Sequence, residues 1–226
     1  MGTLYLVRHG QASFGEDDYD RLSPLGHRQA QRLGEYLRGR FAREGVQIET
    51  VLMGSLTRHR ETWEGLAQGA GWSHAPLVWP GLNEYDSEAL IRAIHPEPLA
   101  RPDTPELYRH HFRLLREAIK AWMDGRTQPR GMARYAEFVA GIEAALDHVR
   151  QNCPGNALIV SSGGPISTAV GRVLGTPPET TIELNLRIRN TALSEFDFTP
   201  KRHMLVTYNT LPHLDSADHQ DWVTFA

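Results

Sequence analysis

The chain has 226 residues, of which 40% are hydrophobic and 23% charged, and its net charge at pH 7 is -3. This charge offers no general attraction for nucleic acid or an anionic membrane, so we expect neither as a partner. Cys153 is the only cysteine, which excludes an intramolecular disulfide and a cysteine-based metal site. No segment resembles a secretory signal or a membrane span, and we expect a cytoplasmic protein with one domain over residues 1–226.

The first predicted element is a strand that ends in a reactive sequence. Residues 4–7 are four apolar residues in succession, which favours a strand buried on both faces. Arg8 and His9 follow directly, and Gly10 marks a tight turn. A charged pair at the exit of a buried strand is unfavourable for stability and is typical of a functional site.

The rest of the chain alternates between strands and helices. Ser23-Pro24 supplies an N-cap and a first-turn proline for a helix. The further predicted elements are a helix from 23 to about 43, a strand at 50–53, a helix from 57 to 69–71, a short strand at 77–79, a helical insertion at 86–131, a helix at 133–150, a strand at 156–160, a helix at 166–174 stopped by Pro177-Pro178, and a terminal hairpin of 191–198 and 203–208. This order predicts an α/β fold, a three-layer αβα sandwich with a mostly parallel central sheet.

Polar side chains follow four of the predicted strands or turns. They are Arg8 with His9, Ser55 with Arg58, Glu84, and the group Ser161-Ser162-Gly163. Ligands of open α/β sheets bind at the carboxyl ends of the strands, so we expect these groups to meet there. We also expect the His9 ring to lie open at the floor of a crevice, with both guanidinium groups directed at it.

These residue types suit phosphoryl transfer, which needs a nucleophile, cations around the phosphoryl oxygens and a proton for the leaving group. His9 is the candidate nucleophile, and Arg8 and Arg58 are the candidate phosphate ligands. Glu84 is the candidate proton donor, and the backbone from Gly163 is a candidate anion cradle. Taken singly, Arg58 and Glu84 also fit a solvated surface, and His9 also fits a structural histidine.

Together, these motifs resemble the histidine phosphatase superfamily, also called the phosphoglycerate mutase-like family. The resemblance is carried, in the family's order, by Arg8-His9-Gly10, Ser55-Leu56-Thr57-Arg58, Leu82-Asn83-Glu84 and Val160-Ser161-Ser162-Gly163-Gly164-Pro165-Ile166. It implies that His9 becomes phosphorylated, that Arg8 and Arg58 bind the phosphate, and that Glu84 donates a proton. We expect Ser162 and Gly163 to contact the phosphate as well. It implies neither a cofactor nor a metal.

One position departs from the family pattern. Members usually carry a second histidine where this chain has Ser162. Replacing a charge-assisted hydrogen bond by a neutral one costs roughly 1.5 to 4 kcal/mol in the transition state, so we expect reduced activity. His213 is one candidate to supply the missing imidazole, because the terminal hairpin returns toward this end of the sheet.

The sequence therefore favours a metal-independent phosphatase that acts on a small phosphomonoester through a phosphohistidine. Two alternatives remain at this stage. One is a catalytically impaired protein that binds a phosphorylated ligand, and the other is a phosphotransferase of the phosphoglycerate mutase type. The stretch from Gln11 to Tyr19 lacks the Glu-rich character of sugar-acid mutases, which disfavours the mutase. The sequence leaves the substrate and the oligomeric state open.

Overall fold

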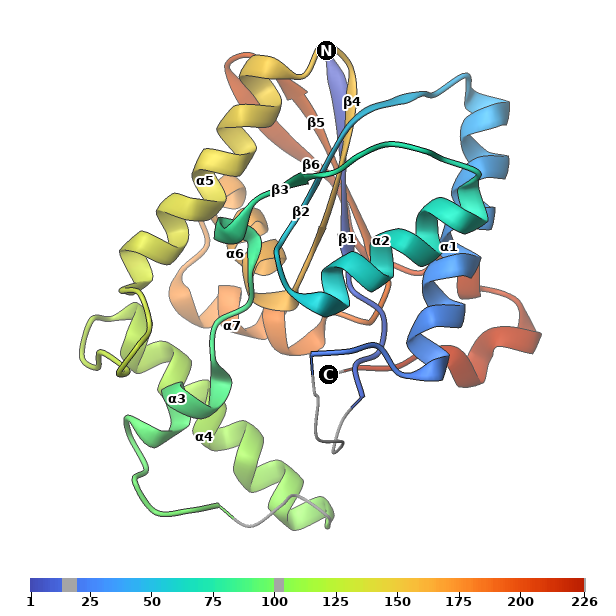
Figure 1. Ribbon diagram of the computed structural model, residues 1–226. Coiled ribbons are helices and arrows are strands. Elements are labelled where there is room, and N and C mark those ends of the chain that lie inside the picture. The colour runs from blue at the N-terminus through green and yellow to red at the C-terminus, as the bar shows by residue number, and fades with distance from the viewer. Residues whose placement is uncertain (14–19, 100–103, 226) are drawn as a thin grey trace.

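A computed structural model describes residues 1–13, 20–99 and 104–225 of the chain. Within this part, one six-stranded sheet has the order β3-β2-β4-β1-β5-β6 (Figure 1). Its strands are β1 (Gly2–Arg8), β2 (Ile48–Met53), β3 (Leu77–Val78), β4 (Asn156–Ser161), β5 (Leu193–Thr199) and β6 (Arg202–Thr210). β1 and β4 lie in the middle of the sheet, so the residues after them lie between neighbouring strand ends.

The sheet is mixed but mostly parallel, as the alternation of strands and helices predicts. β1 pairs with β4, β4 with β2, and β2 with β3, all in parallel. β5 pairs antiparallel with β1, and β6 antiparallel with β5, which makes the predicted terminal hairpin. The carboxyl ends of the four parallel strands therefore share one edge of the sheet.

Helices cover both faces of the sheet, which confirms the three-layer arrangement (Figure 1). α1 and α2 lie on one face, and α5 and α6 lie on the other. The helices are α1 (Pro24–Glu44), α2 (Thr57–Ala70), α3 (Ser87–Arg92), α4 (Pro105–Met123), α5 (Tyr135–Asn152), α6 (Gly163–Leu174) and α7 (Pro178–Arg187). Ser23 caps α1 as predicted, its side chain accepting a hydrogen bond from the Gly26 backbone N–H at 3.0 Å.

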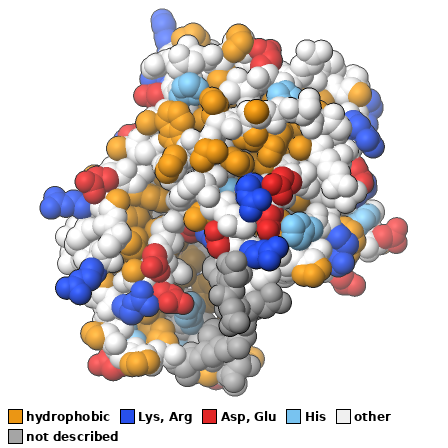
Figure 2. Space-filling model, in the orientation of Figure 1, with side chains coloured by type: hydrophobic (Ala, Val, Ile, Leu, Met, Phe, Trp, Pro, Cys, Tyr) orange, Lys and Arg blue, Asp and Glu red, His pale blue; other side chains and the backbone are white. Residues whose placement is uncertain are grey.

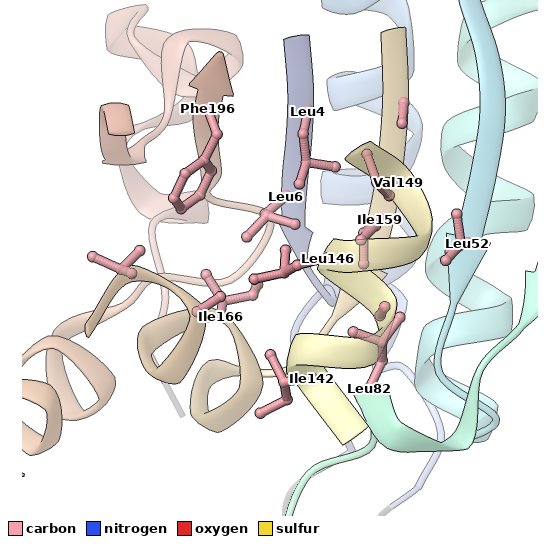
Figure 3. Close-up of a cluster of buried hydrophobic side chains, with 14 of the residues drawn as sticks. Leu4, Leu6, Leu52, Leu82, Ile142, Leu146, Val149, Ile159, Ile166 and Phe196 are labelled. Atoms are coloured by element: carbon pink, nitrogen blue, oxygen red, sulfur yellow. The ribbon is translucent and has the colours of Figure 1, made fainter. Parts of the chain in front are cut away.

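The apolar run of β1 feeds two cores. Leu4 and Leu6 pack with α5 and α6, where Figure 3 shows them among other buried aliphatic side chains. Tyr5 and Val7 point to the opposite face and pack against α1 and α2. Successive strand residues face opposite ways, so an unbroken apolar run is needed to fill both sides.

Two sequence expectations about the helices after β4 are wrong. α6 begins at Gly163, not at residue 166, so the glycine pair forms its first turn. Pro177-Pro178 does not only end a helix, because Pro178 is the first residue of α7, a helix that the sequence analysis omitted. Proline is favoured at the first helical position, where its missing N–H has no intrahelical partner to lose.

In the range 86–131, where the sequence predicts a helical insertion, the described residues contain α3 and α4, which extend beyond the carboxyl ends of the parallel strands (Figure 1). α3 and α4 share a small core with α7, formed by Leu90, Leu115, Ile119, Trp122 and Ile182. None of the helices in the described part of the chain combines the length and apolar character needed to cross a membrane.

The contact between α1 and α2 depends on glycines. A Cβ on Gly34 would collide with the Leu66 carbonyl oxygen, whereas a Cβ on Gly39, on the same helix, would meet only the tip of Arg43 at 3.5 Å. We therefore expect Gly34→Ala to lower the free energy of unfolding by about 1–3 kcal/mol, because the two backbones must separate. Gly39→Ala is the control and should raise it by about 0.5–1 kcal/mol through helix propensity. Urea denaturation measures both, and equal effects would contradict this account of the α1–α2 contact.

Candidate active site

The candidate site lies where β1, β2 and β4 end. Arg8 is paired with Ser161 across β1 and β4, and the His9 backbone N–H donates to the Ser161 carbonyl oxygen at 2.9 Å. The Gly54 N–H, just after β2, donates to the Val160 carbonyl at 3.2 Å. The three strand exits are thus held together by backbone hydrogen bonds, and the side chains that follow them gather at one place.

The His9 imidazole is fixed in a defined tautomer. Its Nδ1 lies 2.7 Å from the Gly10 carbonyl oxygen, which can only accept a hydrogen bond, so Nδ1 carries a proton. Burial, followed by the charges of Arg58 and Arg8, holds the pKa of His9 well below its usual value. The ring is therefore neutral at ordinary pH, and Nε2 carries the free lone pair.

His9 is more enclosed than the sequence analysis expects. Only 5% of the residue's surface is exposed, so its ring does not lie open at a crevice floor. The His59 ring lies against it, with the two ring centroids 5.9 Å apart. The charges of Arg58 and Arg8 both lower the pKa of His9. The expectation that both guanidinium groups point at the ring stays a prediction.

Both arginines are anchored by other groups. The Arg58 Nη1 donates to Asp20 Oδ1 at 2.8 Å, and the other oxygen of Asp20 accepts from the Thr57 N–H. Arg8 Nη1 donates to the carbonyl of Ile188. Both residues are nearly buried, with exposures of 5% for Arg8 and 8% for Arg58. Buried guanidinium groups held in fixed positions act as preorganised positive charge.

Glu84 enters the site from a turn after β3. Asn83 fixes this turn to the start of α2, because its Oδ1 accepts from the Ser55 N–H and its Nδ2 donates to Ser55 Oγ, both at 2.7 Å. Burial raises the pKa of the Glu84 carboxyl above its ordinary value, although the Gly164 N–H and the two arginines oppose this. A carboxyl with a raised pKa suits proton donation.

One backbone donor of the anion cradle that the sequence predicts is already used within the protein. The Gly164 N–H donates to Glu84 Oε2 at 3.1 Å, so this donor positions the carboxyl group. A Cβ on Gly164 would collide with Glu84, and a Cβ on Gly163 would meet Asn185 Oδ1 at 2.7 Å. The glycines are therefore needed for close packing at this point. Ser162, which precedes them, is fully buried.

The site contains a second imidazole that the sequence motifs do not indicate. His59, in the first turn of α2, has no exposed surface, and its Nε2 lies 2.7 Å from Ser162 Oγ. Burial, with the charge of Arg58, lowers the pKa of His59 to about 3. One feature of the sequence could have indicated His59 as a site residue. It lies next to Arg58, at the start of a helix that follows the end of a strand.

His213 is not this second imidazole. It is buried, in the short 3-10 helix Pro212–Leu214, and its Nε2 lies 2.9 Å from Thr191 Oγ1. Thr191 has a φ of 54°, which is unfavourable for a β-branched residue, and its N–H donates to the His9 carbonyl at 3.2 Å. His213 thus supports the backbone behind His9, another role that the sequence did not reveal.

On the face shown in Figure 2, basic, acidic and histidine side chains gather near the centre of the molecule, below a broad hydrophobic area. Over the described residues, no cluster of three or more His, Cys, Asp or Glu side chains is arranged to hold a metal ion. The residues described above that make up the candidate site are Arg8, Arg58, His9, His59, Glu84 and Ser162.

The chain belongs to the histidine phosphatase superfamily (branch 1), whose family model matches residues 4–211. This result agrees with the resemblance carried by the four motifs. No curated protein sequence shows a significant match.

Solved structures share the fold at low sequence identity. A phosphoserine phosphatase mutant from Entamoeba histolytica, in complex with phosphoserine, is 19% identical with a TM-score of 0.62, covering 95% of this chain and 100% of its own. A mycobacterial glucosyl-3-phosphoglycerate phosphatase is 20% identical with a TM-score of 0.64, covering 93% and 99%. A phosphoglycerate mutase from Bacillus anthracis is 17% identical with a TM-score of 0.63, covering 94% of each chain. These likenesses establish the fold.

The buried histidines make the stability of the folded chain sensitive to acid. Burial lowers the pKa of His213 from 6.5 to about 3, so below pH 6.5 the unfolded chain binds a proton that the folded chain refuses. This contribution to stability is present above pH 6.5 and is lost as the pH falls, by about 2 kcal/mol at pH 5.

The free energy of unfolding should fall between pH 7 and pH 5 by about 2 kcal/mol less in His213→Gln than in the wild type. This holds whatever the stability of the variant at pH 7. Urea denaturation at the two pH values measures this difference. His110→Gln is the matched control, because His110 is exposed on α4. An identical pH dependence in His213→Gln and the wild type would contradict the inferred titration.

Proposed function

We propose that this protein is a phosphatase that hydrolyses phosphomonoesters through a phosphohistidine at His9. The observation that carries the proposal is the state of the His9 ring. The Gly10 carbonyl holds the proton on Nδ1, and the two arginines with burial keep the ring neutral, so Nε2 is a ready nucleophile. A purely structural histidine has no need of two buried guanidinium groups beside it.

In the first half of the reaction, His9 Nε2 attacks phosphorus and the bond from phosphorus to the ester oxygen breaks. The departing oxygen takes the proton of the Glu84 carboxyl and leaves as an alcohol. Arg8 and Arg58 stabilise the charge on the remaining phosphoryl oxygens. Their anchoring to Ile188 and Asp20 means that little reorganisation is needed as this charge develops.

In the second half, water attacks phosphorus and gives its proton to the Glu84 carboxylate. The bond between phosphorus and Nε2 breaks, which releases inorganic phosphate and restores both the neutral ring and the protonated carboxyl. Glu84 therefore acts as acid and then as base. The two guanidinium groups supply the positive charge, and we expect turnover to persist in the presence of EDTA.

The nucleophile is tested by His9→Ala, with an aryl phosphate such as p-nitrophenyl phosphate as substrate. We expect at least about a thousandfold loss of kcat, because no other group can form the covalent intermediate. Acid quenching of the wild type during turnover should trap an acid-labile phosphate that His9→Ala lacks. His110→Ala, at an exposed histidine, is the control.

Three outcomes of this experiment would contradict the proposal. Full activity in His9→Ala would remove His9 from the reaction. Binding of phosphate esters without release of phosphate by the wild type would favour a phospho-ligand binding protein. Transfer of the trapped phosphate to a second substrate faster than to water would favour a mutase.

The role of Glu84 is tested by the leaving group. Glu84→Gln should lower kcat/KM for an alkyl phosphate by about 10²–10⁴-fold and for p-nitrophenyl phosphate much less, because nitrophenolate leaves without a proton. For the wild type on the alkyl ester, the rate should fall as the pH rises through the Glu84 pKa, which burial places above its ordinary value. This alkaline limb should be absent in Glu84→Gln, and a loss equal for both substrates would remove Glu84 as the acid.

A further inference from the structure

Ser162 occupies a helix N-cap without performing the usual function of one. It directly precedes α6 and has extended backbone angles, but its side chain makes no capping hydrogen bond. Serine at this position normally accepts from a backbone N–H of the first turn. Here its Oγ instead lies 2.7 Å from His59 Nε2, and both residues are fully buried. The hydroxyl is held by an imidazole rather than by its own helix.

The surroundings of His59 hold its ring in place. A Cβ on Gly54 would collide with the His59 imidazole, so the turn between β2 and α2 leaves room for this ring only because residue 54 is a glycine. The His59 ring also contacts the His9 ring, and the two ring centroids lie 5.9 Å apart. His59 therefore connects the β2 exit, the nucleophile and the hydroxyl of Ser162.

Ser162 also has a direct structural relation to His9. Arg8 and Ser161 are register partners on adjacent parallel strands, so His9 and Ser162 are the next residues along each strand. The His9 N–H donates to the Ser161 carbonyl, which keeps the two chains together at this point. A phosphoryl group on His9 would thus form beside Ser162.

We propose that His59 and Ser162 work as one donor unit, in which the His59 imidazole orients the Ser162 hydroxyl so that its proton points at the phosphoryl oxygens of a group bound at His9. This inference rests on the proposed function and extends it. Ser162 is then a catalytic residue, and His59 is a positioning residue that acts through it.

The hydrogen-bonding capacity of the two side chains supports this direction. Within the described residues, no group is placed to accept a well-formed hydrogen bond from His59 Nδ1, although the Gly54 backbone lies near enough to oppose the lowering of the His59 pKa. An N–H without a well-formed partner is costly to bury. We assign the proton of the neutral ring to Nε2, because its contact with Ser162 Oγ at 2.7 Å is better formed than the Gly54 contact, and Nε2 then donates to the hydroxyl. The serine keeps its own proton for an anionic oxygen, and no proton has to move. A chain of two such bonds also polarises the outer donor.

The unit is tested by comparing Ser162→Ala, His59→Leu and the double variant. We expect each single variant to lower kcat on p-nitrophenyl phosphate by about 10- to 100-fold, with a smaller change in KM. The double variant should be no worse than Ser162→Ala, because each change disables the same donor. His59→Gln should retain more activity than His59→Leu, since its amide can still donate to Ser162. Arg60→Gln, on the exposed side of α2, is the control.

A second experiment moves the imidazole. His59 Nε2 lies so close to Ser162 Oγ that a histidine at 162 would overlap the His59 ring, so Ser162→His alone should lower activity. In a His59→Ala background the same change has room, and we expect His59→Ala with Ser162→His to regain at least about tenfold over His59→Ala. A merely structural histidine at 59 would show no such rescue.

Orthovanadate binding, measured by calorimetry, separates this inference from the proposed function. If the wild type shows no turnover that depends on His9, the proposed function fails. The donor unit is still supported in that case if His59→Leu and Ser162→Ala lose vanadate affinity equally. The donor unit is overturned if His59→Leu matches the wild type, if the two single losses multiply in the double variant, or if the wild type neither turns over nor binds vanadate.

Discussion

The parallel pairing of β1 with β4 is the constraint on which the site depends. It lies in the middle of the sheet, so helices cover both faces and the strands need apolar residues throughout. The polar residues at the ends of the two strands, and those directly after them, are consequently brought side by side at the sheet's edge. His9 and Ser162 are neighbours for this reason, although 152 residues of chain separate them, as their numbers show.

The electrostatics of the site follow from burying two arginines beside two imidazoles. Burial, followed by the positive charge of Arg58, disfavours protonation of both rings, so His9 and His59 have lowered pKa values. The carboxyl of Glu84 responds to burial in the opposite sense, because its charged form is the one that burial disfavours. One environment thus favours a neutral His9 ring and a Glu84 carboxyl that keeps its proton to a higher pH than usual.

Several residues hold these groups in place. Asp20 fixes Arg58, Asn83 fixes the turn that carries Glu84, and His213 supports Thr191 behind the His9 backbone. The positive φ of Thr191 is a local strain next to the proposed nucleophile. A rigid frame of this kind limits the reorganisation that a developing charge would require.

The local patterns in the sequence predicted the strands, most helices and the identities of the residues at the strand exits. Apolar runs, caps and turn residues act over a few positions, so their signal is legible without a fold. The start of α6 and the presence of α7 were missed, because a glycine pair and a proline pair have more than one local meaning.

Tertiary structure decided which groups meet. The sequence pointed to His213 for a second imidazole, but the packing of α2 against the end of β4 brings His59 to Ser162 instead. The tertiary structure also directs the Gly164 N–H toward Glu84 and buries the His9 ring. Such contacts join residues far apart in the chain, and their geometry depends on how helices pack on the sheet. No short sequence pattern predicts that packing. For the site, the sequence by itself determined only which types of residue follow the strands.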